Sequence, residues 1–155
     1  MATILLTGAT GYIASHTWLA LQSAGYSVVG VDDFSNSSPE VLNRIQELGG
    51  QRPVFAQADV NDGAALDAVF AAHRIDAVVH FAACKAVGES AAEPLKYYAN
   101  NLGGLVSVCQ AMQRHGVKTF VFSSSATVYG APQFLPYTED HPLAAMNVYG
   151  RTKLY

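Results

Sequence analysis

Cysteine, long apolar runs and targeting signals are scarce in this chain of 155 residues, and each shortage excludes a class of protein. The only two cysteines, Cys84 and Cys109, form no Cys-x-x-Cys pair and are too few for a disulfide framework. The longest apolar stretches fall far short of the roughly 20 residues that a membrane helix needs. The N-terminus lacks a basic segment followed by a long apolar one, so we expect no signal peptide. A cytoplasmic, reducing compartment fits this composition.

Charge is also sparse, because charged residues make up only 14% of the chain. The nine basic residues are scattered, the formal net charge is −3, and no basic stripe offers a surface to nucleic acid. Half of the residues are hydrophobic, which is enough to bury a sizeable core and argues against disorder. We therefore expect one folded domain that binds neither nucleic acid nor membrane.

Short apolar runs rich in Val, Ile, Leu and Phe alternate with segments of helical periodicity. The runs are continuous rather than alternating, which is typical of strands buried on both faces. Repeated strand–helix alternation predicts βαβ units, and so an α/β fold with a doubly wound, Rossmann-like parallel sheet in the strand order 3-2-1-4-5. The five predicted strands cover residues 3–7, 27–31, 54–58, 76–81 and 118–123.

Four helices are expected between these strands. The first ends at Gly25, and the second covers residues 37–48. The third begins at Asn61 or Asp62, either of which could cap it. The fourth and longest starts at Pro94 and ends at Gly116. Its apolar stripe is interpreted as the face that packs on the sheet, and it consists of Leu95, Tyr98, Leu102, Leu105, Cys109 and Met112.

The first predicted strand runs directly into a turn, residues 8–14, with the spacing Gly-x-x-Gly-x-x-Ala. Gly8 and Gly11 allow a tight turn and a close approach of the backbone to a pyrophosphate. The following helix would direct its free N–H groups and partial positive charge at that anion. Ala14 stands where the dinucleotide fingerprint has its third glycine, and it is small enough for close helix–strand packing. The turn therefore predicts a phosphate-binding loop.

An acidic residue follows at the distance that a dinucleotide site requires. Asp32 ends the second predicted strand, 24 residues after Gly8. A carboxylate there accepts hydrogen bonds from the adenosine ribose hydroxyls and repels a 2′-phosphate. No lysine or arginine lies between Asp32 and Glu40, so the sequence favours NAD over NADP. The neighbouring Asp33 is interpreted as a solvated loop acid.

A second motif begins where the fifth predicted strand ends, in the serine run 123–125. Tyr149 lies 24 residues after Ser125 and opens the pattern Tyr-x-x-x-Lys, which ends at Lys153. On a helix this spacing puts Tyr149 and Lys153 on one face. A phenolate could remove the proton of a substrate hydroxyl while a nicotinamide takes the hydride, and a nearby ammonium would favour the phenolate. Ser125 would hydrogen-bond the same substrate oxygen.

With these motifs in place, the whole chain resembles the extended short-chain dehydrogenase/reductase family. The most specific stretches are TGATGYI (residues 7–13), HFAACKAVGES (residues 80–90) and FSSSATVYG (residues 122–130). Within the middle stretch, KAVGES is similar to the nucleotide-sugar epimerase subgroup rather than to the superfamily at large. Ala14 departs from the family's usual third glycine.

The resemblance implies one NAD site built from several parts of the chain. The adenosine ribose would lie on residues 32–37, the last two of which reach toward phosphate, and Asp59 with Val60 would flank the adenine. Residues 81–85 would run under the pyrophosphate and the nicotinamide ribose. The implied cofactor-binding residues are Gly8, Gly11, Tyr12, Ile13, Asp32, Asp33, Phe34, Ser35, Asn36, Ser37, Asp59, Val60, Phe81, Ala82, Ala83, Cys84, Lys85, Asn100, Ser125, Tyr149 and Lys153.

The resemblance also implies a reaction, the interconversion of UDP-galactose and UDP-glucose by an isomerase. Tyr149 would take the proton from the sugar's 4-hydroxyl, and tightly held NAD would take the C4 hydride. The transient 4-keto sugar would then turn over and receive the hydride on its other face. Lys153 would bridge Tyr149 and the ribose, while Ser125, Thr127 and Tyr149 would contact the UDP-sugar. The family further implies a homodimer of the full-length protein.

Two alternatives stay open. A nucleotide-sugar dehydratase of the same superfamily needs an Asp-Glu pair after the threonine of the serine run, but Val128 follows Thr127 here, which disfavours dehydration. A non-catalytic NAD-binding module often lacks Tyr-x-x-x-Lys, which this chain has. Which sugar is epimerised is left open.

The resemblance predicts that residues 1–155 form an NAD-binding domain that is incomplete at its C-terminus. The family continues for about as many residues again, with the last strands of the sheet and the lobe that grips the uridine and sugar. We therefore expect the isolated 155-residue chain to be inactive. No metal is predicted, because no metal-ligand spacing links the five histidines, which are His16, His73, His80, His115 and His141.

Overall fold

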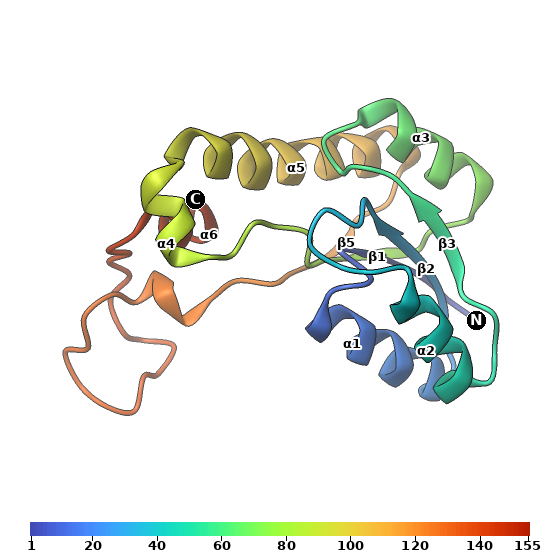
Figure 1. Cartoon of the computed structure of the whole chain (residues 1–155), viewed down its shortest axis with the longest axis horizontal. Helices are drawn as coiled ribbons and strands as arrows, with labels where there is room; N and C mark the ends of the chain where they lie inside the picture. The colour runs from blue at the N-terminus through green and yellow to red at the C-terminus, as the bar shows by residue number, and fades with distance from the viewer. The chain divides into compact units, whose positions relative to one another are not determined.

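The computed structural model describes residues 1–155 (Figure 1). The chain divides into two compact units, and each is described by itself. The first unit comprises Met1–Ala82 and Leu105–Ser123, and the second comprises Ala83–Gly104 and Ser124–Tyr155. No helix combines the length and the apolar character that crossing a membrane requires.

The first unit contains a five-stranded sheet in the order β3-β2-β1-β4-β5, and every neighbouring pair is parallel. The predicted fold class and strand order are therefore confirmed. In the register of the central strands, Leu5 stands opposite Val29 on one side and Val78 on the other. The strands are β1 (Thr3–Thr7), β2 (Ser27–Asp32), β3 (Val54–Gln57), β4 (Ala77–His80) and β5 (Thr119–Phe122).

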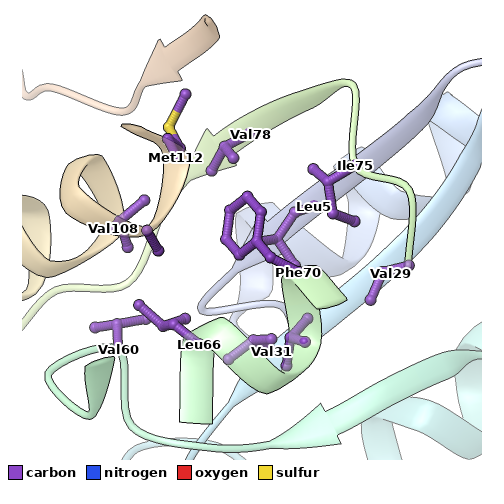
Figure 2. Close-up of a cluster of buried hydrophobic side chains, with 12 residues drawn as sticks. Leu5, Val29, Val31, Val60, Leu66, Phe70, Ile75, Val78, Val108 and Met112 are labelled. Atoms are coloured by element: carbon purple, nitrogen blue, oxygen red, sulfur yellow. The ribbon is translucent and has the colours of Figure 1, made fainter. Parts of the chain in front are cut away.

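Alternate residues of the strands supply two buried layers, one on each face of the sheet. Ile4 and Leu6 point to the face covered by α1 (Tyr12–Ser23) and α2 (Glu40–Gly49). Leu5 points to the other face, where α3 (Gly63–Ala72) and the end of α5 (Pro94–His115) pack (Figure 2). The central strands β1, β2 and β4 are covered on both faces, as the continuous apolar runs predicted. The edge strands β3 and β5 differ, because Val54 and Val121 are 46% and 54% exposed.

The ends of the first three helices follow from local chemistry. α1 is followed by Gly25 in a left-handed conformation, as predicted. α2 begins at Glu40 rather than at residue 37, because Pro39 takes the N-cap position and the Ser37 hydroxyl bonds elsewhere in the loop. Asp62 is the cap of α3, and its carboxylate accepts from the first free backbone N–H groups of that helix.

The stripe predicted for the longest helix is wrong as a buried face except at Met112, which is 6% exposed. In α5, Leu95 is 81% exposed and Cys109 is exposed as well. Besides Met112, the buried face carries the polar Asn101, one aromatic residue and smaller apolar residues, namely Tyr97, Gly104, Val108 and Ala111. The predicted stripe followed the leucines because they are among the most apolar residues of the helix. Burial of this face depends instead on the hydrogen bonds that Tyr97 and Asn101 make with the segment before the helix.

The second unit is built from short elements. α4 (Val87–Ala92) was not predicted from the sequence, and it precedes the first half of α5. After β5 come a single 3₁₀ turn, η1 (Ala126–Val128), an extended loop, and α6 (Val148–Leu154). α6 starts within one residue of the predicted Tyr149. Asn147 caps it by accepting from the backbone N–H of Gly150 at 2.7 Å.

Candidate functional site

The glycine turn after β1 is a tight backbone cradle in the first unit. Gly8 adopts φ +64°, a left-handed conformation that side chains disfavour. A Cβ added at Gly8 would lie 2.8 Å from the backbone nitrogen of Ala82 and 2.9 Å from its Cα. The turn can therefore approach the segment after β4 only because residue 8 has no side chain. The Thr7 hydroxyl joins the same two segments by accepting from the Ala82 N–H at 3.3 Å.

We expect Gly8→Ala to weaken NAD binding at least tenfold in the complete gene product that carries residues 1–155. The left-handed conformation alone costs a side chain roughly 1–2 kcal/mol, and the clash with Ala82 must also move the loop. Gly25→Ala is the matched control, since Gly25 also has positive φ but no atom lies within 4 Å of its added Cβ. Titration with NAD checks both variants, and equal affinity of the two would contradict the role of the cradle.

The N-terminus of α1 is open to an anion. Its N-cap residue, Gly11, offers no side-chain acceptor, and the first turn contains no acidic residue. The first N–H groups of α1 therefore have no side chain to bond, and the helix dipole favours negative charge there. Tyr12 and Ile13 are exposed, at 76% and 59%. These features fit the pyrophosphate of a dinucleotide.

Asp32 at the end of β2 is fixed by its neighbours. One carboxylate oxygen accepts from the backbone N–H of Thr10 at 3.1 Å, and the other from the N–H of Phe34 at 2.9 Å and from the Ser37 hydroxyl at 3.3 Å. Ser37 also shares a 2.6 Å hydrogen bond with the hydroxyl of Thr10, which is buried. The glycine turn and the acidic residue are thus parts of one network. Sequence reasoning missed Thr10, although it lies inside the predicted turn.

The carboxylate of Asp32 should set the preference between the two nicotinamide cofactors. The 2′-phosphate of NADP would lie against the negative charge of this carboxylate. It would also lose bound water without gaining a hydrogen-bond donor from the protein. We therefore expect Asp32→Ala to narrow the preference for NAD over NADP by about tenfold or more, since hydrogen bonds to charged groups contribute roughly 1.5–3 kcal/mol. Titration with both cofactors tests this, with the exposed loop variant Asp140→Ala as control. Equal binding of NAD and NADP by the unaltered protein would refute the assignment of Asp32.

The other sequence-predicted cofactor residues of the first unit lie at the carboxyl ends of the strands, around the same edge of the sheet. Asp33, Ser35 and Asn36 are exposed in the loop after β2, and the Asp33 carboxylate accepts from the N–H of Ser35 at 2.9 Å. After β3, Asp59 is exposed whereas Val60 is buried in the core. After β4 come Phe81 and Ala82, both half-buried.

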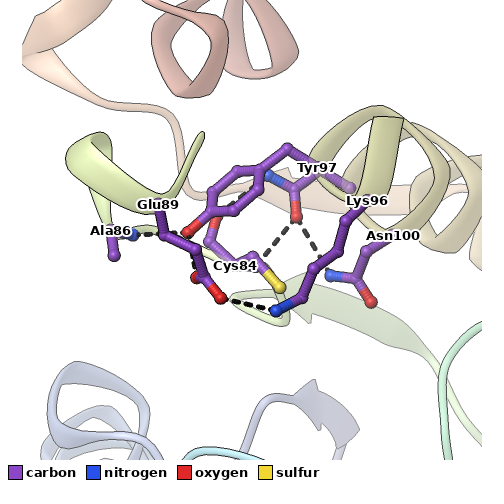
Figure 3. Close-up of polar contacts among 7 residues, drawn as sticks. Cys84, Ala86, Glu89, Lys96, Tyr97 and Asn100 are labelled. Carbon is purple, nitrogen blue, oxygen red and sulfur yellow. Dashed lines mark hydrogen bonds and ion pairs between the residues drawn. The ribbon is translucent and has the colours of Figure 1, made fainter. Parts of the chain in front are cut away.

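The loop after β4 continues into the second unit with Ala83, Cys84 and Lys85. Asn101 of α5 holds it: its side-chain oxygen accepts from the Cys84 N–H at 2.8 Å and its amide donates to the Cys84 carbonyl at 2.9 Å. Asn100, whose position in α5 is visible in Figure 3, donates to the same Asn101 oxygen. Asn101 was missed in the sequence, where it stands next to the predicted Asn100.

Helix α6 presents Tyr149 and Lys153 one turn apart, as the spacing predicted. Thr152 links this helix to the network just described, because its hydroxyl donates to the Tyr149 carbonyl at 2.7 Å and accepts from the Asn101 amide at 2.9 Å. Tyr149 is half-buried, whereas Lys153 is only 7% exposed. The second unit thus holds the Tyr-x-x-x-Lys helix against the loop that contains Cys84.

The serine run meets the same helix. Ser125 caps η1 by accepting from the backbone N–H of Thr127 at 3.2 Å, and its oxygen also accepts from the Thr127 hydroxyl at 2.9 Å. η1 and α6 pack so closely that a Cβ on Gly150 would lie 2.9 Å from the Thr127 carbonyl oxygen. Ser125 and Thr127 are therefore brought beside the first turn of α6, where Tyr149 lies.

Lys153 carries an unusual charge environment. Burial, and then the positive charge of Lys85, lower the pKa of its ammonium from an ordinary 10.5 to about 8. The ammonium is thus protonated at pH 7 and loses its proton as the pH rises through about 8. A lysine with so strongly lowered a pKa is typical of a functional site.

We expect Lys85→Met to raise the pKa of Lys153 while leaving it below 10.5, because burial is the larger cause of its lowering. NMR titration of lysine side chains labelled with ¹³C measures this directly. Lys118→Met, an exposed lysine of the first unit, is the control and should leave the titration unchanged. A Lys153 that titrates at its ordinary value in the unaltered protein would contradict the burial described here.

No group of three or more His, Cys, Asp or Glu side chains is arranged to hold a metal ion. His80, for example, is buried, and its Nδ1 lies 2.7 Å from the Thr7 hydroxyl. The candidate residues offer hydroxyls, amides, lysines, backbone groups and the Asp32 carboxylate, which are the partners that a nucleotide uses.

A parallel doubly wound sheet, a glycine turn, an acidic residue ending β2 and a Tyr-x-x-x-Lys helix together define a class of nucleotide-dependent enzymes. Residues 4–155 match the model of the NAD dependent epimerase/dehydratase family, and the chain belongs to that family.

The similar proteins include UDP-glucose 4-epimerases from distant organisms. The chain is 57% identical to that of Bacillus subtilis over 151 residues and 50% identical to that of Mus musculus over 162 aligned positions. These alignments cover 97% and 100% of this chain, but only 44% and 47% of the relatives. The chain thus spans less than half the length of the curated relatives it matches.

Similar solved structures also include UDP-glucose 4-epimerases. The UDP-glucose 4-epimerase of Bifidobacterium longum, in complex with NAD⁺ and UDP, superimposes with a TM-score of 0.96 at 47% identity, covering 99% of this chain and 46% of that one. The enzyme of Stenotrophomonas maltophila, with bound NAD and formylated UDP-arabinopyranose, matches with the same TM-score, identity and coverage.

Proposed function

We propose that this chain is the NAD-binding part of a nucleotide-sugar 4-epimerase that interconverts UDP-galactose and UDP-glucose. The observation that carries the proposal is that one short unit combines the Tyr149–Lys153 helix, the serine turn and the loop after β4. Similar proteins are named UDP-glucose 4-epimerases, and two of the similar structures hold NAD with UDP or a UDP-sugar. NAD, when bound, supplies a reversible acceptor for the hydride at C4 of the sugar.

The residues of the first unit would hold the cofactor. The turn at Gly8 and Gly11 and the open start of α1 would receive the pyrophosphate, and Asp32 would accept from the adenosine ribose hydroxyls. Asp59 and Val60 would flank the adenine. In the second unit, Ala83 to Lys85 and Asn100 would contact the nicotinamide ribose of the cofactor.

The residues of the second unit would transfer the proton of the sugar's 4-hydroxyl group. Tyr149 would accept the proton of the sugar's 4-hydroxyl and return it after the sugar has turned over. Lys153, one turn along α6, would stabilise the phenolate and bond the ribose, so its positive charge is needed at neutral pH. Ser125 and Thr127 would orient the sugar oxygen. Because the transient 4-keto sugar regains the hydrogen it lost, no net oxidation occurs and the reaction is an isomerisation.

Dehydration is disfavoured by a particular position. A dehydratase needs a carboxylate pair directly after the threonine of the serine turn, whereas Val128 occupies the first of these positions and is 7% exposed in the interior of its unit. A non-catalytic binding module does not require a buried lysine one turn after a half-buried tyrosine, so the pair Tyr149 and Lys153 favours an enzyme.

We also propose that the complete protein is a cytoplasmic homodimer, with the exposed Leu95 and Val106 of α5 as part of the contact.

The experiment that tests the proposal is a coupled assay of the complete gene product. Purified protein is incubated with UDP-galactose, and UDP-glucose is detected with a UDP-glucose-specific dehydrogenase. Formation of UDP-glucose supports the proposal. Formation of a 4-keto-6-deoxy sugar would identify a dehydratase instead, and NAD binding without any turnover of UDP-galactose would favour a binding module or another sugar.

A further inference from the structure

Ser90 of α4 makes an unexpected contact with the helix that carries Tyr149. Its side chain is completely buried, and its hydroxyl donates to the Val87 carbonyl at 2.7 Å. The same oxygen accepts from the backbone N–H of Tyr149 at 3.2 Å, across 59 residues of sequence. The first N–H groups of a helix have no acceptor within the helix. Asn147 takes one of them, at Gly150, and Ser90 takes the one at Tyr149 itself.

α4 is itself held firmly by α5, as Figure 3 shows. Tyr97 is completely buried, and its hydroxyl donates to the Glu89 carboxylate at 2.7 Å and accepts from the backbone N–H of Ala86 at 3.0 Å. Lys96 forms an ion pair with the same carboxylate. Burial, and then Glu89, raise the pKa of the Tyr97 phenol to about 12, so this hydroxyl keeps its proton and remains a donor. A helix of six residues could not hold a position by itself.

A chain of contacts therefore runs from α5 through Glu89 to its neighbour Ser90, and from Ser90 to Tyr149. Thr152 provides a second polar link between α6 and α5, through Asn101. Ser90 and Asn101 thus contact α6 at different residues, Tyr149 and Thr152. The two links act on different parts of α6. Ser90 bonds the backbone of Tyr149 in the first turn, whereas Thr152 lies next to Lys153 in the following turn.

We propose that Ser90 is a positioning residue, whose hydroxyl fixes the backbone of Tyr149 and thereby the place of its phenol. This inference rests on the proposed function, in which Tyr149 is the group that moves the proton. Loss of the hydroxyl would leave the Tyr149 N–H without its acceptor and let the first turn of α6 shift. Small displacements matter here, since a misplacement of about 1 Å can cost about a hundredfold in rate.

The test compares Ser90→Ala with the unaltered complete gene product. We expect kcat for UDP-galactose to fall about tenfold or more, while KM, bound NAD and the affinity for UDP stay within twofold, because Ser90 acts on the phenol and not on either ligand. Ser107→Ala, which also removes a buried hydroxyl, is the control and should keep kcat within twofold. A kcat of Ser90→Ala within twofold of the unaltered protein would overturn the inference, as would a loss of kcat matched by an equal loss of bound NAD.

A second pair of variants separates the hydroxyl from the packing. Ser90→Thr and Ser90→Val have nearly the same shape, but only threonine keeps the hydroxyl. We expect kcat of the threonine variant to exceed that of the valine variant at least fivefold, and equal values would overturn the inference. An unaltered protein without epimerase activity, or a Tyr149→Phe variant with full activity, would instead refute the proposed function on which the inference depends.

Discussion

Replacing Tyr149 by phenylalanine is expected to lower kcat for UDP-galactose by about a thousandfold, within the range known for loss of a positioned acid–base group. The change removes one hydroxyl and leaves the contacts that place the residue intact. These contacts are made by the backbone of Tyr149, whose N–H donates to Ser90 and whose carbonyl accepts from Thr152. The helix should therefore keep its place, and only the proton acceptor should be lost.

Two measurements accompany that comparison. Bound NAD and the affinity for UDP should stay within twofold, because the phenol is needed to move the proton and not to hold either ligand. Tyr26→Phe is the matched control, since Tyr26 is 42% exposed just before β2 and has no assigned role. If Tyr149→Phe turned over UDP-galactose at more than a tenth of the unaltered rate, another residue would have to accept the proton.

The second large effect concerns residues 1–155 produced alone, for which we expect no measurable epimerisation of UDP-galactose. Remote binding of the uridine diphosphate supplies much of the orientation at the reacting carbon. The relatives are more than twice as long as the segment matched here, since this chain covers 44% of the Bacillus subtilis protein. We expect the residues that grip the uridine to lie in the part of those relatives without a counterpart in residues 1–155.

The geometry of α6 strengthens this expectation. A helix of seven residues is marginal in water, so the place of Tyr149 depends on Ser90, Asn101 and whatever else packs on the helix. The assay compares purified residues 1–155, supplied with NAD, against the complete gene product at equal concentration. Turnover by the short polypeptide that disappears in Tyr149→Phe would overturn this expectation, although it would strengthen the assignment of Tyr149.

Much of the first unit could be predicted from sequence because its signals are local. Continuous apolar runs identified five strands, and strand–helix alternation with the turn at Gly8 gave the observed order of the sheet. Asp32 was found because it ends a strand at a fixed distance from Gly8. In each case the relevant residues are neighbours in sequence or follow a period, so one sequence is enough to find them.

The polar interior of the second unit could not be predicted in the same way. Tyr97 and Asn101 are buried because each accepts a hydrogen bond from the backbone of the loop after β4. No periodic pattern in the sequence indicates such contacts. The same cause explains the wrong stripe on α5, where exposed Leu95 was preferred to a buried asparagine. Ser90 bonds a residue 59 positions away, and its helix is too short to leave a period in the sequence.

Thr10 and Asp32 represent an intermediate case. Both lie inside predicted motifs, but the sequence related the glycine turn and the acidic residue only by their spacing, without a contact between them. The structure joins them through the N–H of Thr10 and through its hydrogen bond with Ser37. A variant that disturbs the turn should therefore also disturb the place of the carboxylate, which pattern reasoning alone could not foresee.

The most direct test of the proposed epimerase follows the hydrogen at C4 of the sugar. UDP-galactose carrying deuterium at C4 is incubated with the complete gene product in ordinary water, and the UDP-glucose formed is examined by NMR and mass spectrometry. We expect UDP-glucose that keeps its deuterium at C4, because that hydrogen leaves and returns without exchanging with water. UDP-glucose that has exchanged this deuterium for solvent hydrogen, or the absence of UDP-glucose, would contradict it.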